Sequence, residues 1–475
     1  MKRLILLLLL VASTFATQYD GECDSIRPLK PRPHSVSVSE FGAVGDGKTS
    51  NTVAFQNAIF YLKSFADKGG AQLYVPAGKW LIGCINLTSH LTLFLEKGAT
   101  ILASQDYSNW ALVEPLPSYG QGLEVPGTRY RSLITGYNLI DVVITGSYIC
   151  YSNLFTFPTV LTFLCDICSI GCSGNDGTID GQGSIWWQLL NTRSLNHSRP
   201  HLVEFIGSDT VVVSNLTFLN APAWNIHPAY CSNFLVQNIT VYAPPDSPYT
   251  SGIVPDSSQY ICIENSSISI GYDAVSLKSG WDEYGITFGK PTSNVHIRRV
   301  LLQSSSGSGI AFGSQMSGGI SNVLVEHLSV QDSMIGIELK TARGRGGYVK
   351  SIFVSDVYFE NVQQGIRATG QSEFHPDDKF DSHALPVVSD ITFEDMVGVN
   401  ITMSGIFSGI DEAPFTSICL SNVSFSVGSD INETWVCSNV MGWSLNVLPE
   451  PCSELRNLSA DCFDFSHPKR QFAVL

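Results

Sequence analysis

The sequence predicts an all-β protein, a single right-handed parallel β-helix that is closed at its N-terminal end by a capping helix. Three observations lead to this fold class. Short strands rich in Val, Ile and Phe recur along the chain, each is followed by a polar corner and a second short strand, and no helical periodicity separates the repeats. One such repeat cannot bury its hydrophobic face alone, so successive repeats are expected to stack as the coils of a solenoid.

The repeats begin 23 to 39 residues apart from residue 210 onward. They read "TVVVSNLTF" from Thr210, "NFLVQNITV" from Asn233, "YICIENSSI" from Tyr260, "NVHIRRVLL" from Asn294, "NVLVEHLSV" from Asn322, "SIFVSDVYF" from Ser351 and "DITFEDMVG" from Asp390. A β-sandwich is the alternative all-β architecture, but it needs hairpin turns such as Asn-Gly between its strands. These turns are scarce here, so the pattern favours the β-helix.

The capping helix is expected at Ser50–Ala66, with Ser50 as its N-cap. Its apolar face would be formed by Val53, Phe55 or Ala58, Phe60 and Leu62. A solenoid end needs such a lid because it would otherwise expose a strand edge and the core. We therefore expect one β-helix domain over residues 35–465.

The N-terminus has the pattern of a secretory signal peptide over residues 1–16. A basic start, Met1-Lys2-Arg3, precedes the apolar run Leu4–Ala12 and the small residues of Thr14–Ala16. The run is too short to span a bilayer, and no polar residue interrupts it to give the amphipathic face of a buried helix. The chain is therefore expected to be secreted, to the extracellular space or the cell wall.

The cysteines and asparagines are interpreted in the light of export. Eight of the twelve cysteines are expected to pair in an oxidising compartment, namely Cys23, Cys84, Cys231, Cys262, Cys419, Cys437, Cys452 and Cys462, with one C-terminal disulfide among the last three. Nine N-glycosylation sequons begin at Asn86, Asn196, Asn215, Asn238, Asn265, Asn400, Asn422, Asn432 and Asn457. Because sequons also arise by chance in Ser/Thr-rich sequence, several are expected to stay unused.

The formal net charge of -15 excludes some classes of partner. It disfavours nucleic acid and anionic membrane surfaces, and it requires a local cationic patch for any polyanionic substrate. No cysteine pair with CxxC spacing has histidines nearby, so no metal site is expected, and no cofactor. We expect a monomer.

Residues 147–173, "SYICYSNLFTFPTVLTFLCDICSIGCS", do not fit the repeat pattern. The segment is apolar and contains four cysteines, whereas its flanks would form one normal coil if they were joined directly. A membrane span is disfavoured, because Pro158 and polar residues interrupt the segment and no basic flank anchors it. The remaining interpretations are a loop insertion and a translated intron; the second is favoured, since an exposed apolar cysteine cluster would promote aggregation.

Several long stretches resemble the plant polygalacturonases of glycoside hydrolase family 28. They include "FGAVGDGKTSNTVAFQNAI", "APAWNIHPAY", "YTSGIVPDSSQYICIENSSISIGYDAVSLKSGWDEYG", "GIAFGSQMSGGISNV" and "GIELKTARGRGGYVKSI". The similarity extends from about Phe41 to Pro449, apart from residues 147–173. The resemblance implies a pectinase fold and inverting hydrolysis of α-1,4-galacturonosyl bonds, in which one carboxylic acid protonates the leaving oxygen and other carboxylates activate water.

The resemblance places the catalytic motifs on residues whose chemistry has changed. The family's Asn-Thr-Asp stands here as Tyr249-Thr250-Ser251, so Ser251 replaces a water-activating carboxylate. Its Gly-Asp-Asp stands as Gly271-Tyr272-Asp273, so Tyr272 replaces the proton donor and Asp273 is retained. Ser251 and Asp273 are 22 residues apart, about one coil, and are expected to lie side by side on one wall of the solenoid.

Two further motifs differ in the same way. The family's Gly-His-Gly aligns with Gly307-Ser308-Gly309, which places Ser308 at the histidine position, and its Arg-Ile-Lys aligns with Glu338-Leu339-Lys340, where Glu338 would repel a uronate. The residues that the resemblance assigns to substrate binding are Lys340, Lys278, Glu338, Arg345 and His227. Asp256 and Asp282 are expected to be structural or groove-lining residues.

Two functional hypotheses follow. The first is a secreted pectin-acting hydrolase of the polygalacturonase type, weakened or inactive because the acid and one base are replaced. The second is a non-catalytic cell-wall protein that binds pectin, or a related acidic polysaccharide, at the same groove.

Overall fold

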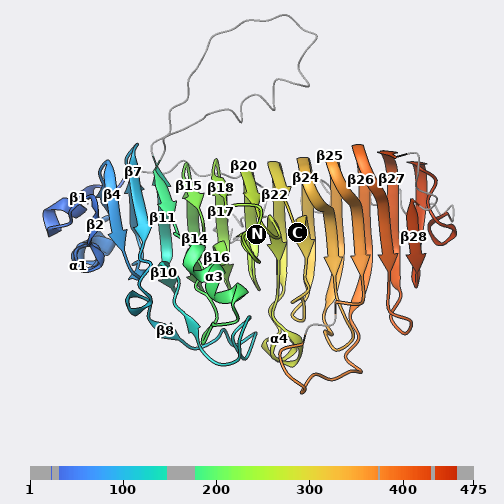
Figure 1. The fold of residues 1–475 in the computed structure, drawn as a ribbon, viewed down its shortest axis with the longest axis horizontal. Coiled ribbons are helices and arrows are strands. Elements are labelled where there is room, and N and C mark those ends of the chain that lie inside the picture. The colour runs from blue at the N-terminus through green and yellow to red at the C-terminus, as the bar shows by residue number, and fades with distance from the viewer. Residues whose placement is uncertain (1–22, 24–30, 147–176, 373–374, 429–433, 457–475) are drawn as a thin grey trace, which may run out of the picture.

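Successive strands stack in parallel along the long axis of the molecule, from the N-terminal coils at one end to the C-terminal coils at the other (Figure 1). The computed structural model describes residue 23 and residues 31–146, 177–372, 375–428 and 434–456. The right-handed parallel β-helix expected from the repeats is confirmed.

The strands form three stacked series. The first series contains β1 (His34–Ser37), β3 (Ala71–Val75), β6 (Leu91–Leu95), β11 (Ile140–Gly146), β14 (Asp209–Ser214), β17 (Ser232–Gln237) and the starts of β20 (Gln259–Ile270), β22 (Thr292–Ser304), β24 (Ile320–Lys340), β25 (Tyr348–Thr369) and β26 (Val387–Ser408), followed by β27 (Phe415–Val427) and β29 (Val440–Leu448). The second contains β2 (Asp46–Ser50), β4 (Gly78–Ile82), β7 (Ala99–Ala103), β12 (Thr178–Asp180), β15 (Thr217–Leu219) and β18 (Thr240–Tyr242) and continues in the later part of β20.

The third series is called the site face below. It contains β5 (Ile85–Asn86), β10 (Ile134–Tyr137), β13 (Val203–Ile206), β16 (Trp224–Ala229), β19 (Ser251–Ile253), β21 (Val275–Leu277), β23 (Ser308–Phe312), the C-terminal parts of β24, β25 and β26, and β28 (Trp435–Ser438). Segments from distant parts of the sequence therefore lie one coil apart on this face.

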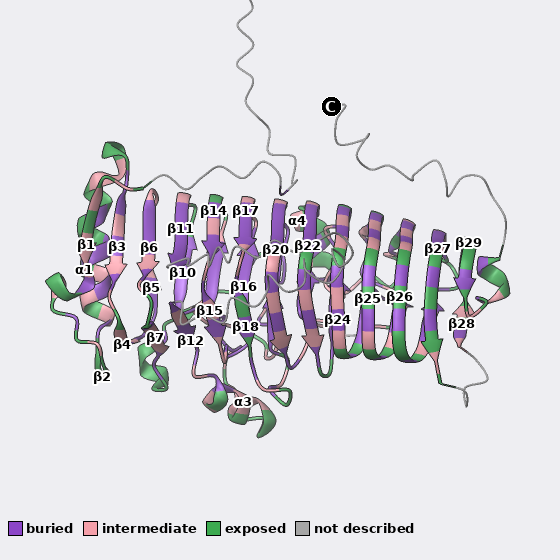
Figure 2. Ribbon diagram, turned by 90° about the horizontal axis from the view of Figure 1, so that it is seen from above, coloured by how far each residue is buried: buried purple, intermediate pink, exposed green. Residues whose placement is uncertain are grey.

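The core is a set of columns of inward side chains, one residue per coil. One column contains Val211, Phe234, Ile261, Val295, Val323, Ile352, Ile391 and Ile418, all buried. Burying each such side chain contributes about 1.5–3 kcal/mol of transfer free energy. The outward positions of the C-terminal strands β25 to β27 are exposed, which gives the alternating bands in Figure 2.

The capping helix exists, but its boundaries and its buried face differ from the prediction. Helix α1 is Thr52–Leu62, followed by a 3-10 helix, Lys63–Lys68. Ser50 is not the N-cap; it ends β2, and Asn51 holds the cap position while its side chain bonds to Val44 and Thr49.

The predicted apolar face of the helix was partly wrong. Val53 and Phe60 are 72% and 77% exposed. The helix buries Phe55, Ala58, Ile59 and Leu62 instead, because this set, and not the predicted one, follows the helical spacing of three and four residues.

Three short elements project beside the site face (Figure 1). They are helix α3 (Ser184–Asn191), helix α4 (Asp282–Phe288) and the antiparallel pair of β8 (Leu112–Val113) and β9 (Arg129–Tyr130). Two more 3-10 helices are Val38–Phe41 and Tyr107–Asn109, and a last one, Ser453–Leu455, follows β29. The projecting loops provide the wall of the site described below.

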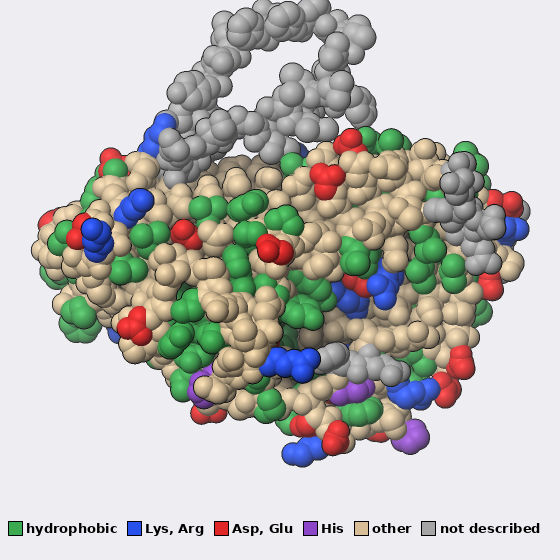
Figure 3. Space-filling model, in the orientation of Figure 1, with side chains coloured by type: hydrophobic (Ala, Val, Ile, Leu, Met, Phe, Trp, Pro, Cys, Tyr) green, Lys and Arg blue, Asp and Glu red, His purple; other side chains and the backbone are tan. Residues whose placement is uncertain are grey.

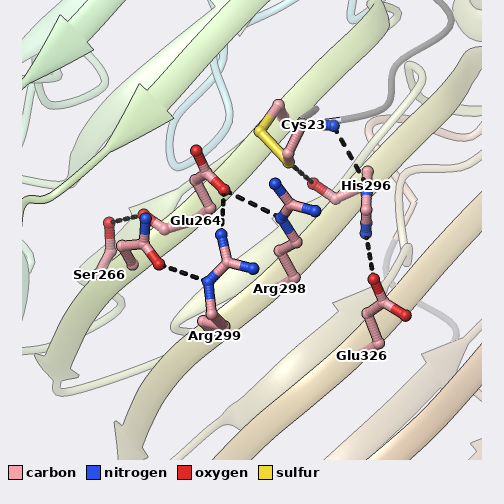
Figure 4. Close-up of a disulfide and its surroundings, with 9 residues drawn as sticks. Cys23, Glu264, Ser266, His296, Arg298, Arg299 and Glu326 are labelled. Carbon is pink, nitrogen blue, oxygen red and sulfur yellow. Dashed lines mark hydrogen bonds and ion pairs between the residues drawn. A yellow bond between two sulfur atoms is a disulfide. The ribbon is translucent and has the colours of Figure 1, made fainter. Parts of the chain in front are cut away.

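Two disulfides have both cysteines among the described residues. Cys437–Cys452 is the expected C-terminal disulfide, and Cys23–Cys262 fixes the N-terminal segment to β20, 239 residues away, beside the Glu264–Arg298 ion pair (Figure 4). The expectation that all eight cysteines pair was wrong for Cys84 and Cys231, which are buried thiols. Their places in the core keep them apart from other cysteines, and burial raises the pKa of the Cys231 thiol to about 12.

The expected signal peptide and all of residues 147–173 lie outside the described residues, as does the predicted C-terminal limit at residue 465. The flanks of the unusual segment can be compared with the next coil. Thr145 pairs with Ser214 and Thr178 pairs with Thr217, so the two flanks are in register with strands of the next coil that only Asn215 and Leu216 separate. Within the described part of the chain, no helix has the length and apolarity needed to cross a membrane.

Candidate functional site

A cavity of about 460 Å³ opens on the site face. Its floor comes from β16, β19, the residues on either side of β21 and the end of β24. Its walls come from the loop before β9, the chain after α3 and residues 314–315 and 372. Hydrophobic and basic side chains gather near the middle of this side of the molecule (Figure 3). Six of the residues predicted for the site line the cavity: His227, Ser251, Tyr272, Asp273, Lys278 and Lys340.

The coil geometry brings Ser251 and Asp273 together. Ile253 in β19 pairs with Val275 in β21, so the residues two positions earlier, Ser251 and Asp273, lie opposite each other. The Gly252 N–H donates to the Asp273 carbonyl at 3.1 Å. Ser251 and Asp273, which are one coil apart in the sequence, therefore lie side by side on the site face.

Asp273 is surrounded by hydrogen-bond donors. Its carboxylate accepts from the Ser308 N–H at 3.1 Å, the Ser276 hydroxyl at 3.3 Å and the Lys340 ammonium at 2.8 Å, and the residue is 1% exposed. An oxygen pair that accepts three such bonds suits a base that activates water, and does not suit a protonated acid.

Lys340 also joins the replaced position Glu338 to this network. Its ammonium lies 3.4 Å from the Glu338 carboxylate, which in turn accepts from the Ser308 hydroxyl and lies 3.6 Å from the Arg367 guanidinium. Burial by itself would lower the pKa of Lys340, but Asp273 and Glu338 outweigh it and raise this pKa. Lys340 is therefore a cation whose charge is already balanced by two carboxylates.

Tyr272 cannot easily replace the missing acid. Lys340 lowers the pKa of its phenol, but Asp273, burial and Glu338 together raise it above its usual value. The ring packs edge-on against Tyr249, with centroids 5.2 Å apart, and the Lys340 ammonium lies 5.1 Å from its centroid. Tyr249 and Tyr272, which stand at two altered motif positions, thus pack against each other at the cavity wall.

Lys278 is the cavity cation that has no hydrogen-bonded carboxylate among the described residues. Its ammonium donates to the Gln315 side-chain oxygen at 2.7 Å and the Gly313 carbonyl at 3.3 Å, and it lies 5.6 Å from the Trp224 ring centroid. Burial lowers the pKa of Lys278 to about 8. The positive charge is present at neutral and acidic pH and is available to an anionic ligand.

His227 belongs to a buried ion cluster beneath the cavity. Its two ring nitrogens lie 3.0 Å from the Glu204 carboxylate and 3.3 Å from the Asp256 carboxylate. Burial opposes protonation, but hydrogen bonds to Asp256 and Glu204 raise the pKa of His227, and Arg129 makes two bonds of 2.8 and 2.9 Å to Glu204. With both nitrogens occupied, His227 has no free atom for proton exchange with a ligand.

Part of the same cluster has the donor atoms of a possible metal centre. Donor atoms of His201, Glu204 and His227 lie within 4.8 Å of one another. However, the Arg129 guanidinium already neutralises Glu204, and a second cation would have to displace it. This donor set does not fit a metal ion.

Three predicted site residues lie outside the cavity lining. Ser308 and Glu338 lie behind it in the Lys340 network. Arg345 is fully buried: its guanidinium pairs with Asp282, which also accepts from His375 at 2.6 Å, and donates to the Ser314 carbonyl at 2.9 Å. Arg345 thus links Asp282, at the start of α4, to the wall residue Ser314.

The sequence did not indicate the aromatic and ionic parts of the site. Trp224 stacks on His201 with centroids 4.4 Å apart and an interplanar angle of 5°, and it lines the cavity. Arg129 and Glu204 were also missed. The only available signal was a charged residue within an otherwise apolar strand, "VEFI" in β13.

Comparisons with known proteins find relatives over most of the chain. Residues 141–450 match the family model of glycosyl hydrolases family 28, and residues 35–132 match a model described as rhamnogalacturonase A/epimerase, pectate lyase-like. A probable polygalacturonase of Vitis vinifera is 45% identical over 444 residues, covering 92% of this chain and 85% of the relative. A probable polygalacturonase of Arabidopsis thaliana is 27% identical over 445 residues, covering 90% and 82%.

Solved structures share the fold. The exopolygalacturonase of Thermotoga maritima matches with a TM-score of 0.73 and 24% identity, covering 91% of this chain and 95% of that one. The polygalacturonase of Erwinia carotovora matches with a TM-score of 0.66 and 22% identity, covering 88% and 99%.

Proposed function

The chain belongs to glycosyl hydrolases family 28, and on that premise we propose that it binds a galacturonate-rich polysaccharide, the backbone of pectin, and hydrolyses it weakly or not at all. The polygalacturonase type follows from the family match and from the identity over most of the chain. The observation that carries the low activity is the environment of Asp273, where Tyr272 and Ser251 stand at the positions of the acid and of the second base.

The chemistry of inverting hydrolysis needs both an acid and a base. Asp273 can still orient and activate a water molecule, but the leaving oxygen would have to take its proton from the Tyr272 phenol. A phenol of raised pKa is a poor acid at neutral pH, and losing a general acid costs about 10²–10⁴ in rate. Ser251 offers no charge to replace the second carboxylate.

Binding makes smaller demands than catalysis. A uronate carboxylate can pair with the Lys278 ammonium while its sugar ring packs against Trp224, beside the aromatic contact of Tyr249 and Tyr272. Lys340 contributes less, because Asp273 and Glu338 already balance its charge. This arrangement supports a pectin-binding role without turnover as the second candidate function.

The proposal also includes export to the extracellular space or cell wall, and a monomeric state. The N-terminal sequence pattern supports export. A disulfide that ties Cys23 to Cys262 suits an oxidising compartment.

Two measurements on the full chain test the proposal. Calorimetric titration should detect oligogalacturonate binding that weakens as salt rises and exceeds the binding of neutral oligosaccharides of the same length, because the attraction is between charges. Reducing-end release from polygalacturonate should be slow or absent.

The two candidate functions are separated by a matched variant. Asp273→Asn removes the remaining water-activating base, so any residual hydrolysis should vanish. Unchanged residual activity in this variant would assign the activity to a contaminant and leave the binding role alone. A folded protein that does not bind oligogalacturonate at low salt would refute both functions.

A further inference from the structure

Five of the sequons coincide with one structural feature, the bend at which a strand of the solenoid turns into the next. Their asparagines all have a left-handed backbone, with φ between 49° and 56°: Asn215, Asn238, Asn265, Asn400 and Asn422. Asn tolerates this conformation better than other residues with a side chain. The bend therefore explains the asparagine without any sugar.

The rest of the sequon also follows from the bend. After Asn238, Ile239 points into the core and Thr240 begins β18 on the outside. The same order holds after Asn215, where Leu216 is buried and Thr217 begins β15. An apolar residue followed by an outward Thr or Ser is what a strand start prefers, so Asn-x-Thr/Ser recurs as a by-product of coil geometry.

The side chains of these asparagines are engaged between coils. The Asn238 amide N–H donates to the Asn215 side-chain oxygen at 3.3 Å, and the Asn215 amide N–H donates to the Thr145 hydroxyl at 3.3 Å. Asn265 accepts from Arg299 at 2.6 Å.

Nearer the C-terminus, the Asn400 amide donates to the Asn361 side-chain oxygen at 2.8 Å, and the Asn422 amide donates to Asp395 at 2.9 Å. Asn400 and Asn422 are exposed, but their amides already bond to the adjacent coil, about 4.8 Å away, so a sugar on the amide nitrogen would compete with that bond.

Asn86 and Asn196 are the two described sequon asparagines that lie outside the bends. Asn86 is half-buried in β5, where its side-chain oxygen is enclosed and its backbone bonds to Gln56 at 2.9 and 3.2 Å. The strand backbone and the enclosed oxygen make Asn86 a less accessible acceptor than an asparagine on an exposed turn.

Asn196 is the more accessible of the two. It is exposed on the turn after α3, its backbone is not left-handed, and no hydrogen bond of its side chain is found among the described residues. Ser198, the third residue of the sequon, is buried and holds the turn through its hydroxyl, which accepts from the Glu124 N–H at 3.0 Å. Ser198 and Arg199 line the cavity, so Asn196 lies at its rim.

We propose that Asn196 carries an N-linked glycan at the rim of the cavity, and that the five bend asparagines keep bare amides that join adjacent coils. The sugar donor is a lipid-linked oligosaccharide diphosphate. Its anomeric carbon bonds to Nδ2 of Asn196, the bond from this carbon to the diphosphate oxygen breaks, and the displaced amide proton leaves with the diphosphate. The proposal rests on export, which is part of the proposed function.

The test is site mapping on the full chain secreted from plant cells. Peptide-N-glycosidase treatment in heavy-oxygen water converts each glycosylated Asn into a labelled Asp, which mass spectrometry locates. Asn196 should be labelled in most molecules, and the peptides of the five bends should be unlabelled. An unlabelled Asn196, in secreted or retained protein, overturns the proposal, as does comparable labelling at the bends.

A pair of variants gives an independent readout. Asn196→Gln should remove the mass of one glycan and leave the melting temperature unchanged. Asn238→Gln should keep the glycan mass and lower the melting temperature, because it disrupts the hydrogen bond to Asn215 and the left-handed bend. The reverse pattern contradicts the proposal. Because oligogalacturonate binding is measured separately, a failure of the glycan assignment is distinguishable from a failure of the proposed function.

Discussion

Replacing Lys278 by Met should abolish a pH dependence of oligogalacturonate binding that the buried ammonium creates. The substitution keeps an unbranched apolar side chain near Trp224 and removes the charge together with the hydrogen bonds to Gln315 and Gly313. Burial lowers the pKa of Lys278 from 10.5 to about 8 in the free protein. A uronate carboxylate beside the ammonium would favour the charged form and raise this pKa again.

The sign and size of the effect follow from proton linkage. Below the free-protein pKa of about 8, Lys278 is charged in both free and bound protein, so affinity is independent of its titration. Above that pKa, binding must take up a proton, and the dissociation constant should rise about tenfold per pH unit. If a uronate restores the ordinary pKa of 10.5, the full shift is 10.5 − 8 = 2.5 units, which corresponds to about 3 kcal/mol or ~300-fold.

The assay is calorimetric titration with non-esterified oligogalacturonate at several pH values on both sides of the Lys278 pKa, at constant ionic strength. Lys290→Met is the matched control, because it removes one exposed positive charge outside the cavity. Wild type and the control should weaken at high pH, whereas Lys278→Met should bind weakly throughout. An affinity that does not change with pH in wild type, or the same pH dependence in Lys278→Met, would refute the role of this ammonium.

Three further predictions concern the replaced motif. Reducing-end release should be at least about 10³-fold slower than in a relative with all the carboxylates, because the acid and one of the two bases are missing; turnover within tenfold would contradict this. The triple variant Ser251→Asp, Tyr272→Asp and Glu338→Arg should gain activity in the same assay. It adds two carboxylates beside Asp273, and the arginine supplies the further positive charge that they need. A single substitution that gains as much would show that the roles of these residues are misassigned. Lys340→Ala should lower the free energy of unfolding by about 3–5 kcal/mol in urea titration, because it leaves Asp273 and Glu338 buried without their ammonium, whereas an unchanged midpoint would show that the network contributes nothing.

The sequence predicted the fold because a solenoid repeats local information. Each coil is specified by its own strands and corners, so the alternation in "TVVVSNLTF" and "NFLVQNITV" is sufficient to identify the stacking. The spacing of one coil also brought Ser251 and Asp273 to the same face. The capping helix was located in the same way, but the inclusion of Val53 and Phe60 in its buried face was an error of periodicity.

By itself the sequence determined the β-helix, the position of the altered motifs and the loss of acidic chemistry at Ser251 and Tyr272. Only the tertiary structure decided which charges remain available. Lys340 meets Asp273 across 67 residues and Arg345 meets Asp282 across 63, whereas Lys278 meets neutral oxygens. The physical reason is that strand alternation fixes which face a side chain occupies, whereas the partner of a buried charge depends on the length and path of the turns between coils.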